Sequence, residues 1–277
     1  MDSSNGLEIS AAILQRKGAS KAGDIPQYVL EHLQAGVIAT VNLTEWLAVD
    51  HSLLLKQVLA QFELQHFHNK FMQERLKEKK IMKVIPAIAN GWRLILGEIG
   101  EVEGKAVFQK LSSHPSDSVR CWAAYIIGLN PELTIAQKLP LIRPFAGDEH
   151  FGVREIAWMA VREAIINELE VSLFILKDWL VDHDEKIRRF AIEAIRPNGV
   201  WAKHITRLKE RPEMGLPLLE IVKSDSAKYV QDSVSNWLND ASKSNPEWVK
   251  QVCARWTESS NTKETNRIVK RALRSLK

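Results

Sequence analysis

Apolar residues recur at helical spacing in the C-terminal half of the chain, and the pattern returns at nearly regular intervals. Four segments share a short polar turn followed by apolar residues at steps of three and four, as at Val119, Ala123 and Ile126. They read HPSDSVRCWAAYIIGL, GDEHFGVREIAWMAVREAI, DHDEKIRRFAIEAIRP and SDSAKYVQDSVSNWLND. Such spacing places the apolar side chains on one face of an α-helix. The chain shows no alternating pattern of the kind that predicts strands.

The period is measured at one polar position that follows the first apolar residue of each segment. That position holds Arg120, Arg154, Arg188, Gln231 and, in a weaker fifth copy, Asn266, so the spacings are 34, 34, 43 and 35 residues. Second helices are predicted between the copies, at 134–144, 169–181 and 216–223. Periods of about 34 to 47 residues with two helices per unit are typical of helical solenoids. Because one helix pair cannot bury its apolar face alone, we predict an all-α fold, a right-handed α-solenoid of HEAT-like helix-pair repeats with a concave side.

The turn before each repeat helix carries an acidic residue. These are Asp117, Asp148, Asp182 and Asp225. A carboxylate at this point accepts hydrogen bonds from the unpaired amides of a helix start, so we expect these side chains to act as helix caps.

The N-terminal part is less regular. Residues 1–24 show no apolar period, so we expect a flexible segment there. Residues 25–277 are predicted to form a single solenoid, irregular over 25–111 and regular over 112–277. Within the irregular part the pattern predicts helices at 44–63 and 67–80, and a helix pair over 81–111.

Composition narrows the class of protein. The 277 residues are 45% hydrophobic and 26% charged, which excludes a wholly disordered chain. No apolar run reaches the roughly 18 residues of a membrane helix, and the polar, acidic start does not resemble a secretory signal. Cys121 and Cys253 lie far apart, which argues against a disulfide framework or structural zinc site. We therefore expect a cytoplasmic protein.

Charge is unevenly distributed. The net charge is +4 overall, yet residues 186–211 contain eight basic and two acidic side chains, and residues 241–277 contain nine and three. The rest of the chain is therefore net acidic. This asymmetry indicates a surface for a polyanion in the C-terminal half, although solvated helix faces would produce the same count.

Individual residues leave alternatives open. The sequence contains no phosphate loop, nucleophile elbow, dinucleotide fingerprint or zinc-protease motif. The repeat arginines either bond the Asp of a neighbouring repeat in a ladder, the structural role that we favour for Arg120, or contact phosphates, which stays open for Arg154 and Arg188. Tryptophans beside the basic segment, among them Trp158, Trp201 and Trp237, either fill the core or stack on nucleic acid.

Two carboxylates stand out against the basic background. Glu193 lies off the apolar stripe of its helix, and Asp240 continues the polar stripe of Ser233 and Asn236. Each could stabilise positive charge on a sugar and orient a water molecule. From spacing alone we favour an ion pair between Arg189 and Glu193, worth about 0.3–0.5 kcal/mol, and a helix-end position for Asp240.

Four runs resemble a known family. FGVREIAWMAVR, RRFAIEAIRPNGVWAKHI, YVQDSVSNWLNDASKSNPEW and IVKRALRSL are similar to the bacterial DNA alkylation repair family of HEAT-like DNA glycosylases, and closer to the AlkC branch than to AlkD. The resemblance covers most of 37–277 and is specific from about residue 112. It implies a monomer in the bacterial cytosol or nucleoid whose concave face binds duplex DNA with alkylated bases. It also implies excision of cationic N-alkylated purines such as 3-methyladenine, without a metal or other cofactor.

The resemblance assigns roles to individual residues. Glu193 and Asp240 become the catalytic carboxylates, and Trp158, Trp201 and Trp237 pack against the lesion and its sugar. The DNA backbone contacts become Arg154, Arg188, Arg189, Arg196 and Lys203.

The sequence departs from the AlkC branch in two ways. That branch offers a further acidic residue near the position of Trp158, where this chain has only Glu155, three residues earlier. The immunoglobulin-like domain that many members carry is not in this sequence. Two alternatives to a glycosylase therefore remain: a non-catalytic repeat protein that binds branched or damaged DNA or a protein, and a pure protein-interaction module.

Overall fold

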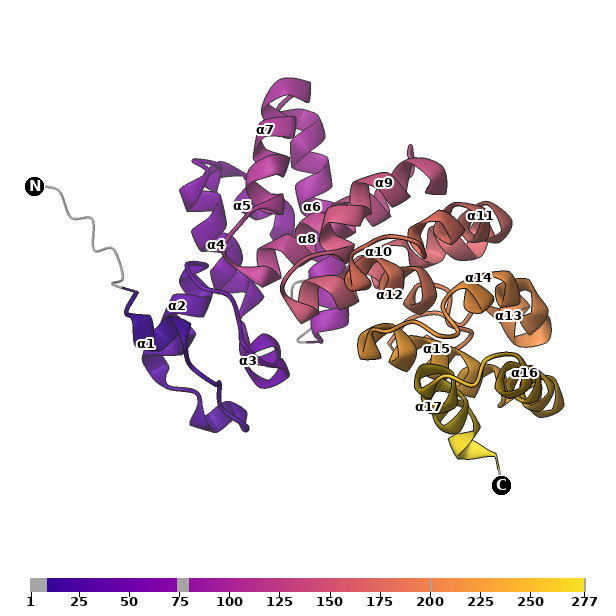
Figure 1. Ribbon diagram of the computed structural model, residues 1–277. Helices are drawn as coiled ribbons and strands as arrows, with labels where there is room; N and C mark the ends of the chain where they lie inside the picture. The colour runs from indigo at the N-terminus through magenta and orange to yellow at the C-terminus, as the bar shows by residue number, and fades with distance from the viewer. Residues whose placement is uncertain (1–8, 74–79, 200, 277) are drawn as a thin grey trace, which may run out of the picture. The chain divides into compact units, whose positions relative to one another are not determined.

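The computed structural model describes residues 9–73, 80–199 and 201–276, and within them every regular element is a helix (Figure 1). The all-α prediction is confirmed. Residues 1–8 of the segment predicted to be flexible lie outside the described residues. The part of the chain that the structure describes forms seventeen α-helices: α1 (Ala11–Leu14), α2 (Gln27–Ala35), α3 (Leu43–Ala48), α4 (His51–Gln61), α5 (His68–Gln73), α6 (Ile81–Glu98), α7 (Glu101–Ser112), α8 (Asp117–Leu129), α9 (Ile135–Ala146), α10 (Phe151–Asn167), α11 (Leu169–Trp179), α12 (Glu185–Glu193), α13 (Thr206–Glu210), α14 (Leu216–Ile221), α15 (Lys228–Ala241), α16 (Pro246–Ser259) and α17 (Lys263–Ala272).

The chain packs as two compact units. Unit 1 contains residues 1–130 and 150–153, and unit 2 contains residues 131–149 and 154–277. The first three residues of α10 thus group with unit 1 and the rest of that helix with unit 2. The expectation of one continuous solenoid over 25–277 stays a prediction.

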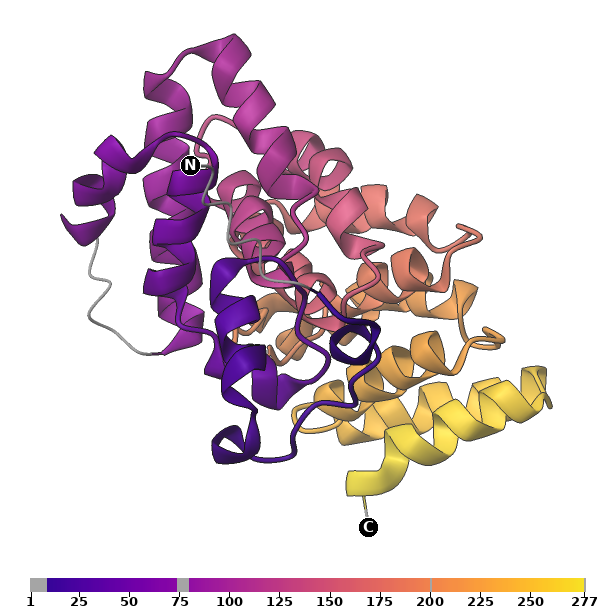
Figure 2. The same ribbon diagram turned by 90° about the vertical axis from the view of Figure 1, so that its left-hand side faces the viewer.

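The repeat helices begin where the sequence period placed them. α8, α10, α12, α15 and α17 start at Asp117, Phe151, Glu185, Lys228 and Lys263, which reproduces the spacings of 34, 34, 43 and 35 residues. In unit 2, α12 packs on α15 and α15 on α17 in one row, while α9, α11 and α14 pack in sequence as a second row. α16 and α17, drawn in yellow in Figure 2, lie side by side at the end of the unit. Unit 2 is therefore a stack of HEAT-like helix pairs.

The repeated polar residue has one structural role in four copies. Arg120, Arg154 and Arg188 each donate Nη1 to the main-chain carbonyls six and five residues earlier, at 2.7–3.1 Å. Gln231 donates its amide to the equivalent carbonyls of Asp225 and Ser226. Each side chain thus closes the turn that precedes its own helix, a contact that the sequence did not predict. The predicted bond to the Asp of a neighbouring repeat is formed by Arg188 with Asp225.

Three of the acidic turn residues, Asp117, Asp182 and Asp225, do not cap their helices as predicted. Asp182 and Asp225 accept from the amides two residues ahead of them, inside the turn. Asp184 is the residue that caps α12, through the amide of Lys186. Asp117 is fully buried and instead accepts from the amide and hydroxyl of Thr40. The cause is position, because Asp117 lies one residue after the cap of its helix, and Asp182 and Asp225 lie two residues before theirs.

Unit 1 differs from its prediction near residue 50. One helix was expected over 44–63, and the structure has α3 and α4 in its place. Asp50 separates them because its carboxylate caps α4, accepting from the amides of Ser52 and Leu53 at 2.9 and 3.1 Å. α6 and α7 match the helix pair predicted over 81–111, with Gly100 in a left-handed conformation between them. No described helix is both long and apolar enough to cross a bilayer.

Candidate functional site

Five charged side chains of unit 2 alternate in sign and form one connected chain, which we call the charge cluster: Glu155, Arg189, Glu193, Arg196 and Asp240. Glu155 comes from α10, Arg189 and Glu193 from α12, Arg196 from the segment after α12, and Asp240 from the end of α15. The links run from Arg189 Nη2 to Glu155 Oε1 (2.5 Å) and Glu193 Oε2 (3.6 Å), and from Arg196 to Glu193 and Asp240. Helix stacking therefore brings together residues up to 85 positions apart in the sequence.

Arg196 joins the two carboxylates that the sequence singled out. Its Nη1 lies 2.5 Å from Glu193 Oε1, while its Nε and Nη2 lie 2.9 and 2.8 Å from Asp240 Oδ2. Asp240 is the penultimate residue of α15, as expected, and its other oxygen lies 3.3 Å from Lys243 Nζ. Glu193 and Asp240 therefore converge on one guanidinium, and each is only 5% exposed.

The surroundings of Glu193 keep it ionised. Burial raises the pKa of its carboxyl, but Arg189 and Arg196, with a 2.7 Å hydrogen bond from Ser233, outweigh burial and hold the pKa below its usual range. The i,i+4 pair of Arg189 with Glu193 is confirmed at 3.6 Å. It is one part of a larger buried arrangement rather than an isolated surface pair.

Glu155 is the accessible carboxylate of the charge cluster. Its side chain is 35% exposed, and its oxygens accept from Arg189 and from Trp158 Nε1 (2.9 Å). Arg189 is buried between this carboxylate and the ring of Tyr229, whose centroid lies 4.9 Å from the guanidinium carbon. Among the described residues, Arg189 Nε and Nη1 have no hydrogen-bond partner. The ring of Tyr229 adds a cation–π contact to the two carboxylates that pair with this guanidinium.

The three predicted tryptophans occupy different environments. Trp237 is fully buried and donates Nε1 to the carbonyl of Ile195 at 2.9 Å. Trp158 is 2% exposed and held by Glu155. Both rings are buried in this structure, and their predicted packing against a lesion stays a prediction. Trp201 is 60% exposed and has a positive φ of 59°, a conformation that bulky residues rarely adopt.

The predicted DNA backbone contacts are mostly engaged within the protein. Arg154 donates Nε to the Tyr229 hydroxyl (3.2 Å), and Arg188 donates Nε and Nη2 to Asp225 (2.7 and 3.0 Å). Hydrogen bonding to Asp225 raises the pKa of Arg188. Arg189 and Arg196 belong to the charge cluster. Lys203 is the accessible cation of the set, with a side chain 67% exposed and 2.6 Å from Glu163.

Sequence reasoning noted Glu155 only as a departure and did not identify Tyr229 or Arg162. Arg162 is 2% exposed on α10, and Glu155, Trp158 and Arg162 follow one another at steps of three and four, so all three lie on one face of that helix. That spacing was the available signal.

Within the described residues, no group of three or more His, Cys, Asp or Glu side chains is arranged to hold a metal ion. The arrangement can stabilise a developing cation and orient water through its carboxylates.

Comparison with known proteins supports the fold. Residues 104–196 match the family model for HEAT repeats. The uncharacterized protein YhaZ of Bacillus subtilis (strain 168) is 35% identical over 128 residues, which are 46% of this chain and 35% of that protein.

Two solved structures share the architecture. Alkylpurine DNA glycosylase AlkC of Pseudomonas fluorescens, bound to DNA containing an abasic site analog, is 21% identical, with a TM-score of 0.62 over 89% of this chain and 62% of that one. AlkD2 of Streptococcus mutans is 24% identical, with a TM-score of 0.57 over 76% of this chain and 97% of that one. This chain thus spans less than two thirds of the AlkC chain. The resemblance noted in the sequence is confirmed at the level of the HEAT-like solenoid fold.

Proposed function

We propose that this chain is a DNA glycosylase that hydrolyses the N-glycosidic bond of cationic N-alkylated purines, such as 3-methyladenine, in duplex DNA. The observation that carries the proposal is the charge cluster, in which three carboxylates and two guanidiniums alternate and Glu193 stays ionised. The shared fold with AlkC, whose solved structure contains DNA, supports it.

The chemistry requires little from the protein. An alkylated purine already carries a positive charge, so the bond from sugar C1′ to nitrogen breaks with both electrons leaving on the base, which departs neutral. The sugar is left with oxocarbenium character, and water adds to C1′ and gives up one proton. Carboxylates stabilise the positive charge on the sugar and accept that proton. The products are a free neutral base and an abasic site.

The residues have distinct roles in this proposal. Glu193 and Asp240 supply the catalytic negative charge, and Glu155 joins them because it is the carboxylate of the charge cluster most exposed to solvent. Trp201 offers an exposed ring to a sugar or base, and Lys203 an exposed cation to a phosphate. One copy of the chain would act on duplex DNA in the bacterial cytosol, without a metal or other cofactor.

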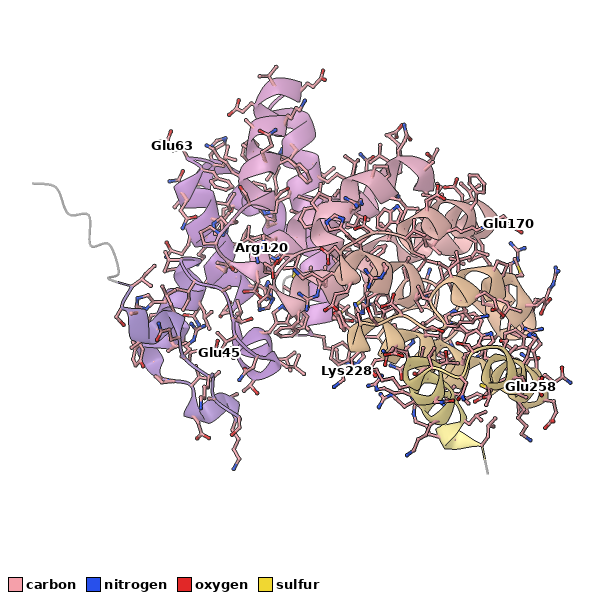
Figure 3. The ribbon with its side chains drawn as sticks, viewed as in Figure 1. Glu45, Glu63, Arg120, Glu170, Lys228 and Glu258 are labelled. Carbon is pink, nitrogen blue, oxygen red and sulfur yellow. The ribbon has the colours of Figure 1, made fainter. Side chains whose placement is uncertain are left out.

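The test is release of methylated base from N-methylated duplex DNA. We expect Glu193→Gln, Asp240→Asn and Glu155→Gln each to lower the single-turnover rate about 100-fold or more. DNA affinity should stay unchanged or rise, because a negative charge near phosphates is removed. Glu170→Gln is the matched control: Glu170 is an exposed, arginine-paired carboxylate at the start of α11, labelled in Figure 3. Wild-type protein that releases no base refutes the proposal.

A second candidate is a non-catalytic protein that binds DNA. The observation that favours it is the near-complete burial and ion pairing of Glu193 and Asp240, which suits a purely structural role. In that case no base is released, DNA still binds, and the carboxylate variants lower only stability. A pure protein-interaction module would instead lose DNA affinity at modest salt.

A further inference from the structure

Helix α12 ends at Glu193, and the main chain that follows it determines where Arg196 lies. The carbonyls of Phe190, Ile192 and Glu193 accept from the next main-chain amides, and Pro197 has no amide with which to continue the helix. Here the main chain after Glu193 receives buried side-chain donors at three consecutive residues. Trp237 donates to the carbonyl of Ile195, and Arg162 donates to those of Ala194 and Arg196.

Arg162 makes most of these contacts. Its Nη1 lies 2.6 Å from the Ala194 carbonyl oxygen, its Nη2 2.5 Å from that of Arg196, and its Nε 2.9 Å from that of Lys203. A planar guanidinium presents its donors in a fixed fork, so three carbonyls held this way cannot move independently. Arg162 thus pins both ends of the segment that follows α12.

Arg162 and the charge cluster are linked through Arg196. The main chain of Arg196 is held by Arg162, while its side chain joins Glu193 to Asp240. A shift of the Arg196 backbone therefore moves the guanidinium that positions both proposed catalytic carboxylates.

The arrangement is costly for a purely structural cap. Burial, followed by the nearby charge of Arg196, lowers the pKa of Arg162 to about 10, while Glu193 and Asp240 act in the opposite direction. A neutral donor would satisfy the same carbonyls without two buried cations side by side. The guanidinium of Arg162 also stacks over Trp158, 5.9 Å from its ring centroid, and Trp158 in turn holds Glu155.

We propose that Arg162 is a positioning residue of the glycosylase site, which holds the main chain after α12 and so sets the place of Arg196 between the two carboxylates. The inference rests on the proposed function and adds to it a residue that touches none of the reacting atoms. It also gives buried Trp237 a supporting role in the same segment.

The experiment compares Arg162→Lys, which keeps the charge but not the three-way hydrogen bonding, with Arg162→Gln, which loses both. The matched control is Arg120→Lys in α8, where a guanidinium also binds two main-chain carbonyls, in unit 1 (Figure 3). Three readouts are measured: single-turnover base release, affinity for the same duplex, and amide hydrogen exchange over residues 194–205.

We expect both Arg162 variants to lower the base-release rate about 100-fold, since small misplacements of catalytic groups have effects of that size. DNA affinity should stay within about threefold, because the residue is buried, and exchange over 194–205 should become about tenfold faster. Arg120→Lys should change none of the three. The split between an altered rate and an unaltered affinity separates positioning from general destabilisation.

The outcomes are distinguishable. If wild-type protein releases base and both Arg162 variants match it in rate and exchange, the positioning inference is wrong and the proposed function stands. If wild-type protein releases no base, the proposed function falls, and exchange over 194–205 alone decides whether Arg162 holds that segment. Should Arg162→Gln fail to fold, Arg162→Lys carries the comparison.

Discussion

Replacing Glu193 by Gln removes one negative charge from between the buried guanidinium of Arg189 and the partly buried one of Arg196. Arg189 and Arg196 keep Glu155 and Asp240 as partners but lose the carboxylate that both share. Removing one partner of a buried ion pair costs about 3–5 kcal/mol. Because Gln keeps an acceptor for Ser233 or Arg196, we expect the lower end of that range, about 3 kcal/mol.

The stability that Glu193→Gln loses relative to wild type should become smaller as the pH falls. The pKa of Glu193 lies below its usual range in the folded protein, so on acidification the unfolded chain takes up this proton first. The stabilisation by Glu193 is therefore complete above the unfolded pKa, about 4.3, and is lost as the pH falls through the lower folded value. The difference between wild type and Glu193→Gln should shrink over that acidic range.

The assay is urea denaturation followed by near-ultraviolet circular dichroism at pH 7, 5, 4 and 3. In a parallel thermal melt, a loss of about 3 kcal/mol in the free energy of unfolding corresponds to a melting temperature lower by roughly 6–12 °C for a chain of this size. Glu170→Gln should match wild type at every pH because that pair is exposed. Agreement of Glu193→Gln with wild type to within about 0.5 kcal/mol at pH 7 would refute the reasoning.

Three further predictions concern other parts of the chain. Burial lowers the pKa of His51 to about 4, so stability should fall as the pH drops from 6.5 to 4, and His51→Gln should flatten that slope in a pH series of thermal melts. Asp117→Ala should cost about 3 kcal/mol because two donors of Thr40 lose a buried acceptor, and unchanged urea midpoints would contradict this. Lys203→Ala should lower DNA affinity and reduce the slope of log affinity against log salt concentration by about one, with an unaltered melting temperature. Arg188→Ala should instead lower the melting temperature, because its carboxylate partner Asp225 lies within the protein.

The repeat architecture was predictable from the sequence alone because its signals are local. Apolar residues at helical spacing and polar turns are set by near neighbours in the chain, so the five repeat helices begin where the period placed them. The break between α3 and α4 was missed because Asp50 interrupts an apolar pattern that otherwise continues through it. The sequence predicted a bond from a repeat arginine to the Asp of the neighbouring repeat, which Arg188 forms with Asp225, but not the carbonyl contacts that Arg120, Arg154 and Arg188 share.

The candidate site was predictable only in part. Spacing identified the pair of Arg189 with Glu193, since both lie on one helix four residues apart. It could not show that Arg196 joins Glu193 to Asp240, a contact that depends on how α12 stacks against α15. Residue type left core packing and a binding surface both open for Trp237, and the structure shows an indole that is fully buried and donates to Ile195.

The order of helices and turns follows from residues that are neighbours along the chain, where spacing and side-chain type specify the conformation. Burial, charge pairing and access to solvent arise between residues tens of positions apart, and they depend on which helix faces pack together. For that reason Glu155, Tyr229 and Arg162 gained significance only once the helices of unit 2 were stacked, while Lys203 and Trp201 are the predicted contacts that this packing leaves exposed.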